Sequence, residues 1–158
     1  MQTLCAMAHY DYKKPGVYGY EDAFEIMRRL NLPKAQAIQL FRRMVFNLIA
    51  RNQDDHTKNI SFLMDKNGQW KLSPAYDMTY AYNPSGIWTN SHQMTVQGKR
   101  DNITKQDLMA VAQHINYKNG LDDIQHISDT VANWSEYSEE AGISKRQYRA
   151  LARAFRII

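Results

Sequence analysis

The sequence has 158 residues, of which 44% are hydrophobic and 23% charged, a composition that suits one globular domain with a buried core. Its single cysteine excludes an internal disulfide and fits a reducing compartment such as the cytoplasm. The net charge of +4 suits anionic partners such as ATP but falls short of a nucleic-acid-binding signature. We expect no membrane association, because no apolar run approaches the roughly 20 residues of a membrane span and no secretion signal opens the chain.

The first part of the chain predicts two helices. After a polar segment, "YDYKKPGVYGYED" (residues 10–22), Phe24, Met27 and Leu30 recur at helical spacing. Pro33 ends this pattern and is well placed to open a second helix. That helix has an apolar face made of Ala37, Phe41, Met44, Val45 and Leu48.

A β-hairpin is predicted next. The segments "ISFLM" (60–64) and "QWKLS" (69–73) are predicted strands. They flank "DKNG" (65–68), which predicts a turn containing glycine. "DKNG" has some likeness to a calcium loop, but no acidic ligand follows at the right distance, so a turn is preferred. The segment "SHQMTVQGK" (91–99) predicts a further strand.

The last third predicts three helices. Thr104 and Asp107 have the spacing of a capping box, ahead of Leu108, Val111, Ala112 and Ile115. A second helical stripe contains Leu121, Ile124, Ile127, Val131 and Trp134. Ser144 is expected to cap the last helix, with Tyr148, Leu151, Ala152 and Phe155 facing inward. The whole pattern predicts a single domain over residues 1–158, of the α+β class, mainly α with a small β-hairpin.

Polar residues gather in the segment "RNQDDHTKN" (51–59), between the second predicted helix and the hairpin. An antiparallel hairpin brings its open ends together, because paired strands lie about 5 Å apart. Asn59 enters the first strand and Asp77 follows the second, so we expect them to lie close together, with Asp54 on the loop just before. One amide and two carboxylates are oxygen ligands that suit Mg²⁺.

The spacing of these residues points to phosphoryl transfer. Asp54 and Asn59 have the spacing of the kinase catalytic loop, in which Asp orients the acceptor hydroxyl and Asn holds a metal ion. Asp77 follows the hairpin, where a second metal-binding Asp is expected. His56 lies where a donor near the transferred phosphate is useful, and Lys58 is a candidate counter-charge for phosphate.

Each of these residues also has a structural interpretation when taken alone. Asp54 and Asp55 are typical of a solvated loop or a helix-end cap, and a lone His56 is usually a structural hydrogen-bonding group. Lys58 by itself suits the surface, Asn59 a strand entry, and Asp77 a turn. Only the joint spacing, with the hairpin between, favours the catalytic interpretation.

The segments "FNLIARNQDDHTKNISFLMD" (46–65) and "GQWKLSPAYDMTY" (68–80) resemble the C-terminal kinase domain of HipA-family toxins. That family combines an N-x-D-x-H-x-K-N loop with a downstream P-x-Y-D segment, and the likeness extends from about residue 18 to residue 108. The loop is also similar to the D-x-H-x-x-N loop of phosphatidylinositol-type lipid kinases. The resemblance implies the C-terminal lobe of a lipid-kinase-like protein kinase fold.

The resemblance also implies an activity and partners. It implies a serine/threonine kinase that uses ATP and Mg²⁺, with Asp54 as the catalytic Asp and Asn59 and Asp77 as the metal ligands. The implied partners are a HipB-like DNA-binding antitoxin and a protein substrate such as an aminoacyl-tRNA synthetase. These proteins are bacterial, and a cytoplasmic location is expected.

The sequence departs from the kinase pattern in two respects. Asp77-Met78-Thr79 stands where protein kinases have D-F-G, and no G-x-G-x-x-G motif occurs. The N-terminal lobe of HipA proteins, which carries the phosphate-binding loop and an autophosphorylated serine, is not recognised here. We therefore expect these 158 residues to be the C-terminal lobe alone, dependent on an N-terminal lobe as its partner.

Two other classes of function stay open. A catalytically inert, kinase-like module would act through partner contacts. A basic nucleic-acid-binding domain would use one face of the last helix, although such a face is usually solvated. That face contains Lys145, Arg149, Arg153 and Arg156. A cluster of aromatic residues is expected to pack around the loop after the hairpin rather than to stack on bases: Tyr76, Tyr80, Tyr82 and Trp88.

Overall fold

The computed structural model describes all 158 residues as seven helices and three short strands. In chain order these are β1 (Gln2–Thr3), α1 (Leu4–Met7), α2 (Tyr20–Arg29), α3 (Lys34–Ile49), β2 (Ser61–Met64), β3 (Trp70–Leu72), α4 (Lys105–His114), α5 (Gly120–Ala132), α6 (Trp134–Glu140) and α7 (Lys145–Ala154). The predicted class, mainly α with a small antiparallel β part, is confirmed. None of the helices has the length and apolar character needed to cross a membrane.

The predicted hairpin is present and is joined by a strand that the sequence did not indicate. Strands β2 and β3 pair antiparallel with Phe62 opposite Leu72, and Gly68 adopts a φ of +78° in the turn between them. The two residues of β1 pair along the other edge of β2, with Gln2 opposite Phe62. The chain start is therefore tied to the hairpin, and Cys5 extends this contact by donating its N–H to the Thr57 carbonyl at 3.1 Å.

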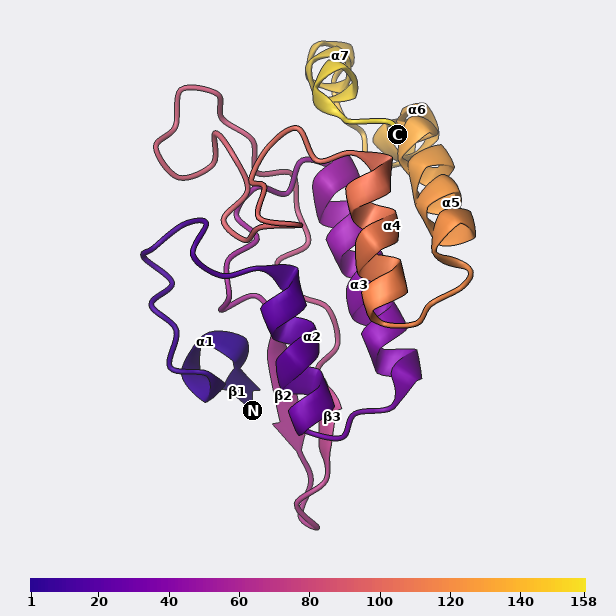
Figure 1. The fold of residues 1–158 in the computed structure, drawn as a ribbon. Helices are drawn as coiled ribbons and strands as arrows, with labels where there is room; N and C mark the ends of the chain where they lie inside the picture. The colour runs from indigo at the N-terminus through magenta and orange to yellow at the C-terminus, as the bar shows by residue number, and fades with distance from the viewer.

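Helix α3 is the centre of the fold. It lies alongside α4 and α5 (Figure 1) and packs against both. Most of the apolar face expected from the sequence is buried, namely Phe41, Met44, Val45 and Leu48, whereas Ala37 is partly exposed. Pro33 stands just before the helix, as expected, and the α2 residues Phe24 and Met27 join the same core.

The end of α3 sets the position of the polar loop. The backbone turns sharply at Arg51, which has a φ of +57°, and the Asn52 N–H then returns to the Asn47 carbonyl at 2.9 Å. Residues 51–60 consequently leave the buried end of α3 and enter β2 at Ser61. The loop is fixed at both ends by buried elements.

The predicted strand at 91–99 is wrong. Thr95 and Gly19 form an isolated bridge, Val96 pairs back with Lys99 across a tight turn, and no ladder forms. The turn needs positive φ at Gln97 and Gly98 (+50° and +73°), which stops an extended run. Residues 92–96 are buried loop instead, and no neighbouring strand edge is available to them.

The C-terminal helices are mostly as expected. Thr104 and Asp107 form the predicted capping box, and Ser144 accepts the Gln147 N–H at the start of α7. Four details were wrong. Leu121, in the first turn of α5, is exposed, and so is Ala152. No residue of α7 is buried, and Tyr148, Leu151 and Phe155 are only partly covered. Trp134 begins the separate helix α6.

The basic face of α7 is exposed, as expected for a solvated face, at Lys145, Arg149 and Arg153. Arg156 was wrongly placed on it. Arg156 lies beyond the helix end at Ala154, is partly buried, and pairs with Asp101. Burial lowers the Arg156 pKa, and the nearby charge of Arg51 lowers it further.

Candidate active site

Residues 53–58, within the loop from Arg51 to Ile60, alternate between buried and more exposed side chains. The Asp54 side chain is 52% exposed, whereas Asp55 is only 2% exposed. His56 is partly exposed and Thr57 is buried, so the alternation continues past the two aspartates. An extended segment behaves in this way because successive side chains point to opposite sides.

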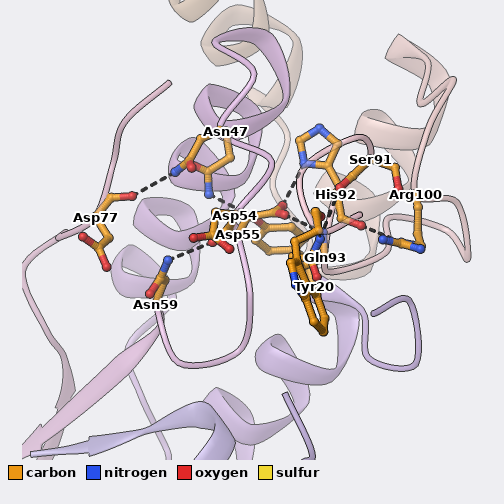
Figure 2. A network of polar contacts seen from close by, with 12 residues as sticks. Tyr20, Asn47, Asp54, Asp55, Asn59, Asp77, Ser91, His92, Gln93 and Arg100 are labelled. Carbon is orange, nitrogen blue, oxygen red and sulfur yellow. Dashed lines mark hydrogen bonds and ion pairs between the residues drawn. The ribbon is translucent and has the colours of Figure 1, made fainter. Parts of the chain in front are cut away.

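Asn59 and Asp77 line one small crevice, as the hairpin argument predicted. The crevice has a volume of about 20 Å³, which is room for one water molecule or one ion. Asn59 Nδ2 donates to the Asp54 carbonyl at 2.9 Å, while Asn59 Oδ1 and the Asp77 carboxylate accept no hydrogen bond from the protein. Figure 2 shows both side chains on one side of the loop. Their oxygens are therefore free for a cation.

Two buried asparagines hold the backbone at Asp77. Asn52 Nδ2 donates to Asn47 Oδ1 at 2.9 Å and to the Asp77 carbonyl at 3.0 Å. Asp77 has a φ of +53°, a left-handed conformation that Asp tolerates better than most residues and that often occurs at functional sites. Asn52 Oδ1 is buried without a partner. The crevice thus contains one more oxygen with no protein donor.

Asp54 lines a second, larger cavity on the neighbouring side of the loop. This cavity has a volume of about 440 Å³, and its lining consists of Tyr12, Lys13, Asp54, His56, Trp88 and Gln93. His56 lines both this cavity and the crevice. Its Nε2 lies 3.9 Å from Asp54 Oδ1, and its Nδ1 is buried without a partner.

Lys58 points away from the crevice. Its Nζ lies 3.6 Å from the centre of the Tyr12 ring, a cation–π contact, and Lys58 lines neither the crevice nor the cavity. The residues of the predicted site are therefore arranged as two neighbouring groups. One group consists of Asn59 and Asp77, and the other consists of Asp54 and His56. Lys58 lies beside the second group.

Asp55 is the centre of a buried polar cluster that the sequence did not reveal. Its Oδ2 accepts the Tyr20 hydroxyl at 2.9 Å and lies 3.0 Å from His92 Nδ1, while its Oδ1 accepts the Gln93 N–H at 2.8 Å. Tyr20 in turn accepts Asn47 Nδ2 at 3.0 Å. Burial raises the pKa of Tyr20 well above its ordinary value, and the charge of Asp55 raises it further.

This cluster connects the two groups of the site to the rest of the fold. Figure 2 shows the contacts that join Asp55, on the loop, to the segment that carries His92 and Gln93. Asn47 belongs both to this cluster and to the contact with Asn52. The only sequence signal for it was the period-two alternation in "DDHT", which places Asp55 opposite Asp54.

The aromatic residues after the hairpin are mostly packing groups, as expected. The Tyr76 hydroxyl donates to the Lys58 carbonyl at 2.6 Å, Tyr80 meets Phe155 edge to face, and Arg51 stacks on Tyr82. Trp88 is the most exposed of them, with half of its surface accessible, and Tyr80 is also exposed at 36%.

The candidate site thus consists of a small crevice with free carboxylate and amide oxygens, next to a cavity lined by a second aspartate. The model of the family described as "HipA-like C-terminal domain" matches residues 1–156. The chain belongs to this family, and the resemblance drawn from the loop and P-x-Y-D motifs is confirmed.

Curated relatives carry kinase names. The chain is 38% identical over 84 residues to "Putative kinase Y4mE" of Sinorhizobium fredii (strain NGR234), a match covering 51% of this chain and 20% of that protein. It is 42% identical over 43 residues to "Putative kinase" of Haemophilus influenzae (strain Rd), covering 27% of this chain and 12% of that protein.

A solved structure shares the fold. The complex of HipA, HipB and operator DNA from the Shewanella oneidensis MR-1 toxin–antitoxin system matches with a TM-score of 0.68 at 19% identity. The match covers 84% of this chain and 35% of the matched chain. The chain therefore spans well under half of the proteins it matches.

Proposed function

We propose that this chain is the C-terminal catalytic lobe of a HipA-type serine/threonine kinase, which transfers the γ-phosphoryl group of ATP to a protein hydroxyl with the help of Mg²⁺. The observation that carries the proposal is the shared crevice of Asn59 and Asp77, whose oxygens have no protein partner, beside the cavity that Asp54 lines. Kinase names among the relatives support it.

The crevice fits a metal ion better than it fits a nucleotide. Mg²⁺ is commonly bound by one or two protein oxygens together with water and phosphate oxygens. Asn59 Oδ1 and the Asp77 carboxylate would supply the protein ligands, and the volume of about 20 Å³ leaves the phosphates outside the crevice. When bound, the ion neutralises charge on the phosphates. Asn47 and Asn52 in the lining of the crevice are neutral, and the lining also includes one basic and one acidic residue, Arg43 and Asp55.

Asp54 would orient the acceptor. In the transfer, the hydroxyl oxygen forms a bond to the γ-phosphorus, the bond from that phosphorus to the bridging oxygen of ADP breaks, and the hydroxyl proton passes to the Asp54 carboxylate. His56 lines both spaces and would donate a hydrogen bond to the transferred group from one ring nitrogen. Lys58 would have to leave the Tyr12 ring before it contacts phosphate.

The rest of the assignment concerns partners. We propose that an N-terminal lobe with a phosphate-binding loop completes the ATP site, and that a HipB-like, DNA-binding antitoxin is a further partner, by likeness to the Shewanella complex. The protein substrate would be of the class implied by the family, such as an aminoacyl-tRNA synthetase, and the location cytoplasmic.

The test is reconstitution. Phosphoryl transfer depends mainly on positioning and electrostatics, so a lobe with half of the phosphate contacts should be a poor catalyst. We expect the 158 residues to fold, bind Mg²⁺ and ATP weakly, and transfer no phosphate at a useful rate. Addition of a HipA-like N-terminal lobe should restore phosphorylation of a protein serine, measured with radiolabelled ATP.

Two variants sharpen this test. In the two-lobed protein, Asp77→Asn should weaken Mg²⁺-dependent nucleotide binding, because a ligand charge is lost. Asp122→Asn, in the exposed first turn of α5, is the matched charge-removal control and should behave like the parent. Strong transfer by the isolated chain would show that the nucleotide site has been misplaced.

One observation favours the alternative that the chain is a catalytically inert, kinase-like module acting through partner contacts. Ile87 and Trp88 expose 81% and 50% of their surface on the loop after the hairpin, and exposed apolar side chains suit partner contacts. This alternative predicts partner binding that is indifferent to Asp54→Asn and Asp77→Asn. An inactive two-lobed protein that still binds its partner would favour it.

A further inference from the structure

The cavity lined by Asp54 is much larger than the metal crevice. Its volume of about 440 Å³ is in the range of small-ligand sites, and two aromatic side chains, Tyr12 and Trp88, contribute to its lining. Both expose part of their rings to solvent. Lys13 is its only cationic lining residue. A cavity of this kind favours a side chain with apolar surface over a second phosphate.

The wall of the cavity is held from behind by the buried cluster. Gln93 lines the cavity, is itself 5% exposed, and receives its position from Asp55, which accepts its backbone N–H at 2.8 Å. The Gln93 side chain donates to the carbonyl of Trp88. Gln93 therefore connects the Trp88 backbone to the carboxylate of Asp55, which is next to Asp54 in sequence.

Tyr12, the other aromatic lining residue, is held by the loop itself. Tyr12 packs under the Lys58 ammonium, with 3.6 Å between Nζ and the ring centre, and meets His56 edge to face with 6.0 Å between ring centroids. The Tyr12 ring and the Trp88 backbone are consequently fixed relative to the loop that carries Asp54. Preorganised walls lower the entropic cost of binding.

We propose that this cavity binds the acceptor segment of the protein substrate, and that it selects a serine or threonine next to a large apolar side chain, which enters between Tyr12 and Trp88. The inference rests on the proposed function, because Asp54 is taken as the residue that orients the hydroxyl. The metal crevice and the acceptor cavity then lie on neighbouring sides of one loop, with His56 lining both.

A binding experiment without ATP tests the cavity alone. The probe is the acetylated and amidated peptide Ala-Ser-Phe-Ala, compared with the same peptide carrying Gly, Lys or Glu in place of Phe. Titration of the ¹⁵N-labelled chain should shift the Trp88 indole N–H and the Gln93 amide. The Phe peptide should bind at least about tenfold more tightly than the others, because it buries an aromatic ring.

Variants of neighbouring residues provide the controls. Trp88→Ala should abolish the preference for Phe, and Trp88→Phe should restore it. Ile87→Ala is the matched control: Ile87 is more exposed than Trp88, stands beside it and does not line the cavity, so the preference should persist. Equal affinity for all four peptides, shifts confined to another surface, or an unchanged preference in Trp88→Ala would each overturn the proposal.

Transfer to the same peptides by the two-lobed protein separates the inference from the proposed function. Faster phosphorylation of the Phe peptide, dependent on Trp88, would support both. Phosphorylation of all peptides at equal rates would overturn the acceptor preference and leave the kinase assignment standing. No transfer to any peptide or protein, with Trp88-dependent Phe binding retained, would overturn the kinase assignment and with it the acceptor role, leaving a peptide-binding cavity.

Discussion

Asp54 and Asp55 are neighbours in sequence, yet they lie in opposite environments. Asp54 is half-exposed and its carboxylate has no hydrogen bond, with only the His56 ring at 3.9 Å, whereas Asp55 is buried and is held by Tyr20, His92 and the Gln93 N–H. The difference arises because the loop is extended there and alternates its sides. The buried Asp55 carboxylate fixes the loop, and the Asp54 carboxylate is left accessible to solvent.

The largest effect should come from the exposed side. In the two-lobed protein, Asp54→Asn should lower phosphoryl transfer by about 100- to 10,000-fold, because the group that orients the hydroxyl and takes its proton is lost. Nucleotide binding should be retained, since Asn59 and Asp77 are unchanged. Initial rates of serine phosphorylation and the affinity for Mg²⁺-ATP measure the two properties. Equal, modest losses in Asp54→Asn and Asp77→Asn would show that the roles are wrongly assigned.

The second largest effect should be a loss of stability when the buried aspartate, Asp55, is replaced. Asp55→Ala leaves the Tyr20 hydroxyl, the His92 ring and the Gln93 N–H without their acceptor, and should lower the free energy of unfolding by about 3–5 kcal/mol. Asp54→Ala is the matched control and should change it by no more than about 0.5 kcal/mol. Urea unfolding followed by circular dichroism measures both. Similar losses would mean that the two aspartates do not differ as described.

The predictable part of the site was the part encoded locally. The stripe of α3, the "DKNG" turn and the antiparallel geometry together place Asn59 and Asp77 in one crevice, and each rests on residues close in sequence. The division into a crevice and a cavity was not predicted. It depends on Tyr12 and Trp88, which no motif connects to the loop.

The buried cluster could not be predicted, because its contacts are distant in sequence. Tyr20 and His92 lie 35 and 37 positions from Asp55, and hydrophobic periodicity carries no information about such polar pairs. The lack of information about distant contacts also explains why the strand predicted at 91–99 is wrong. Residues 92–96 are all buried, with the Gln93 N–H bonded to Asp55 and the Thr95 carbonyl to the start of α2. A strand would need a partner edge, and both edges of the sheet lie elsewhere.

The smallest effect concerns Tyr20, which links Asp55 to Asn47. Tyr20→Phe should cost about 1–3 kcal/mol of unfolding free energy at pH 8, because two buried hydrogen bonds lose a partner. Burial, and then the charge of Asp55, raise the pKa of Tyr20 above 10. The folded state thus holds this proton more tightly than the unfolded chain. The contribution of Tyr20 to stability is complete below about pH 10 and falls as the pH rises above that value.

The difference between parent and Tyr20→Phe should therefore shrink with rising pH. At pH 10.5 the unfolded parent gains roughly 0.8 kcal/mol from ionisation of this one tyrosine, which the folded parent does not share. The other tyrosines ionise in both proteins and cancel in the difference. Phe24→Leu, which removes no titratable group, should cost the same at pH 8 and pH 10.5 in urea unfolding. If the difference in unfolding free energy between parent and Tyr20→Phe stays constant or widens with pH, Tyr20 loses its proton as easily in the folded protein as in water. Asp55 would then lack the shielding from solvent that the contrast with Asp54 requires.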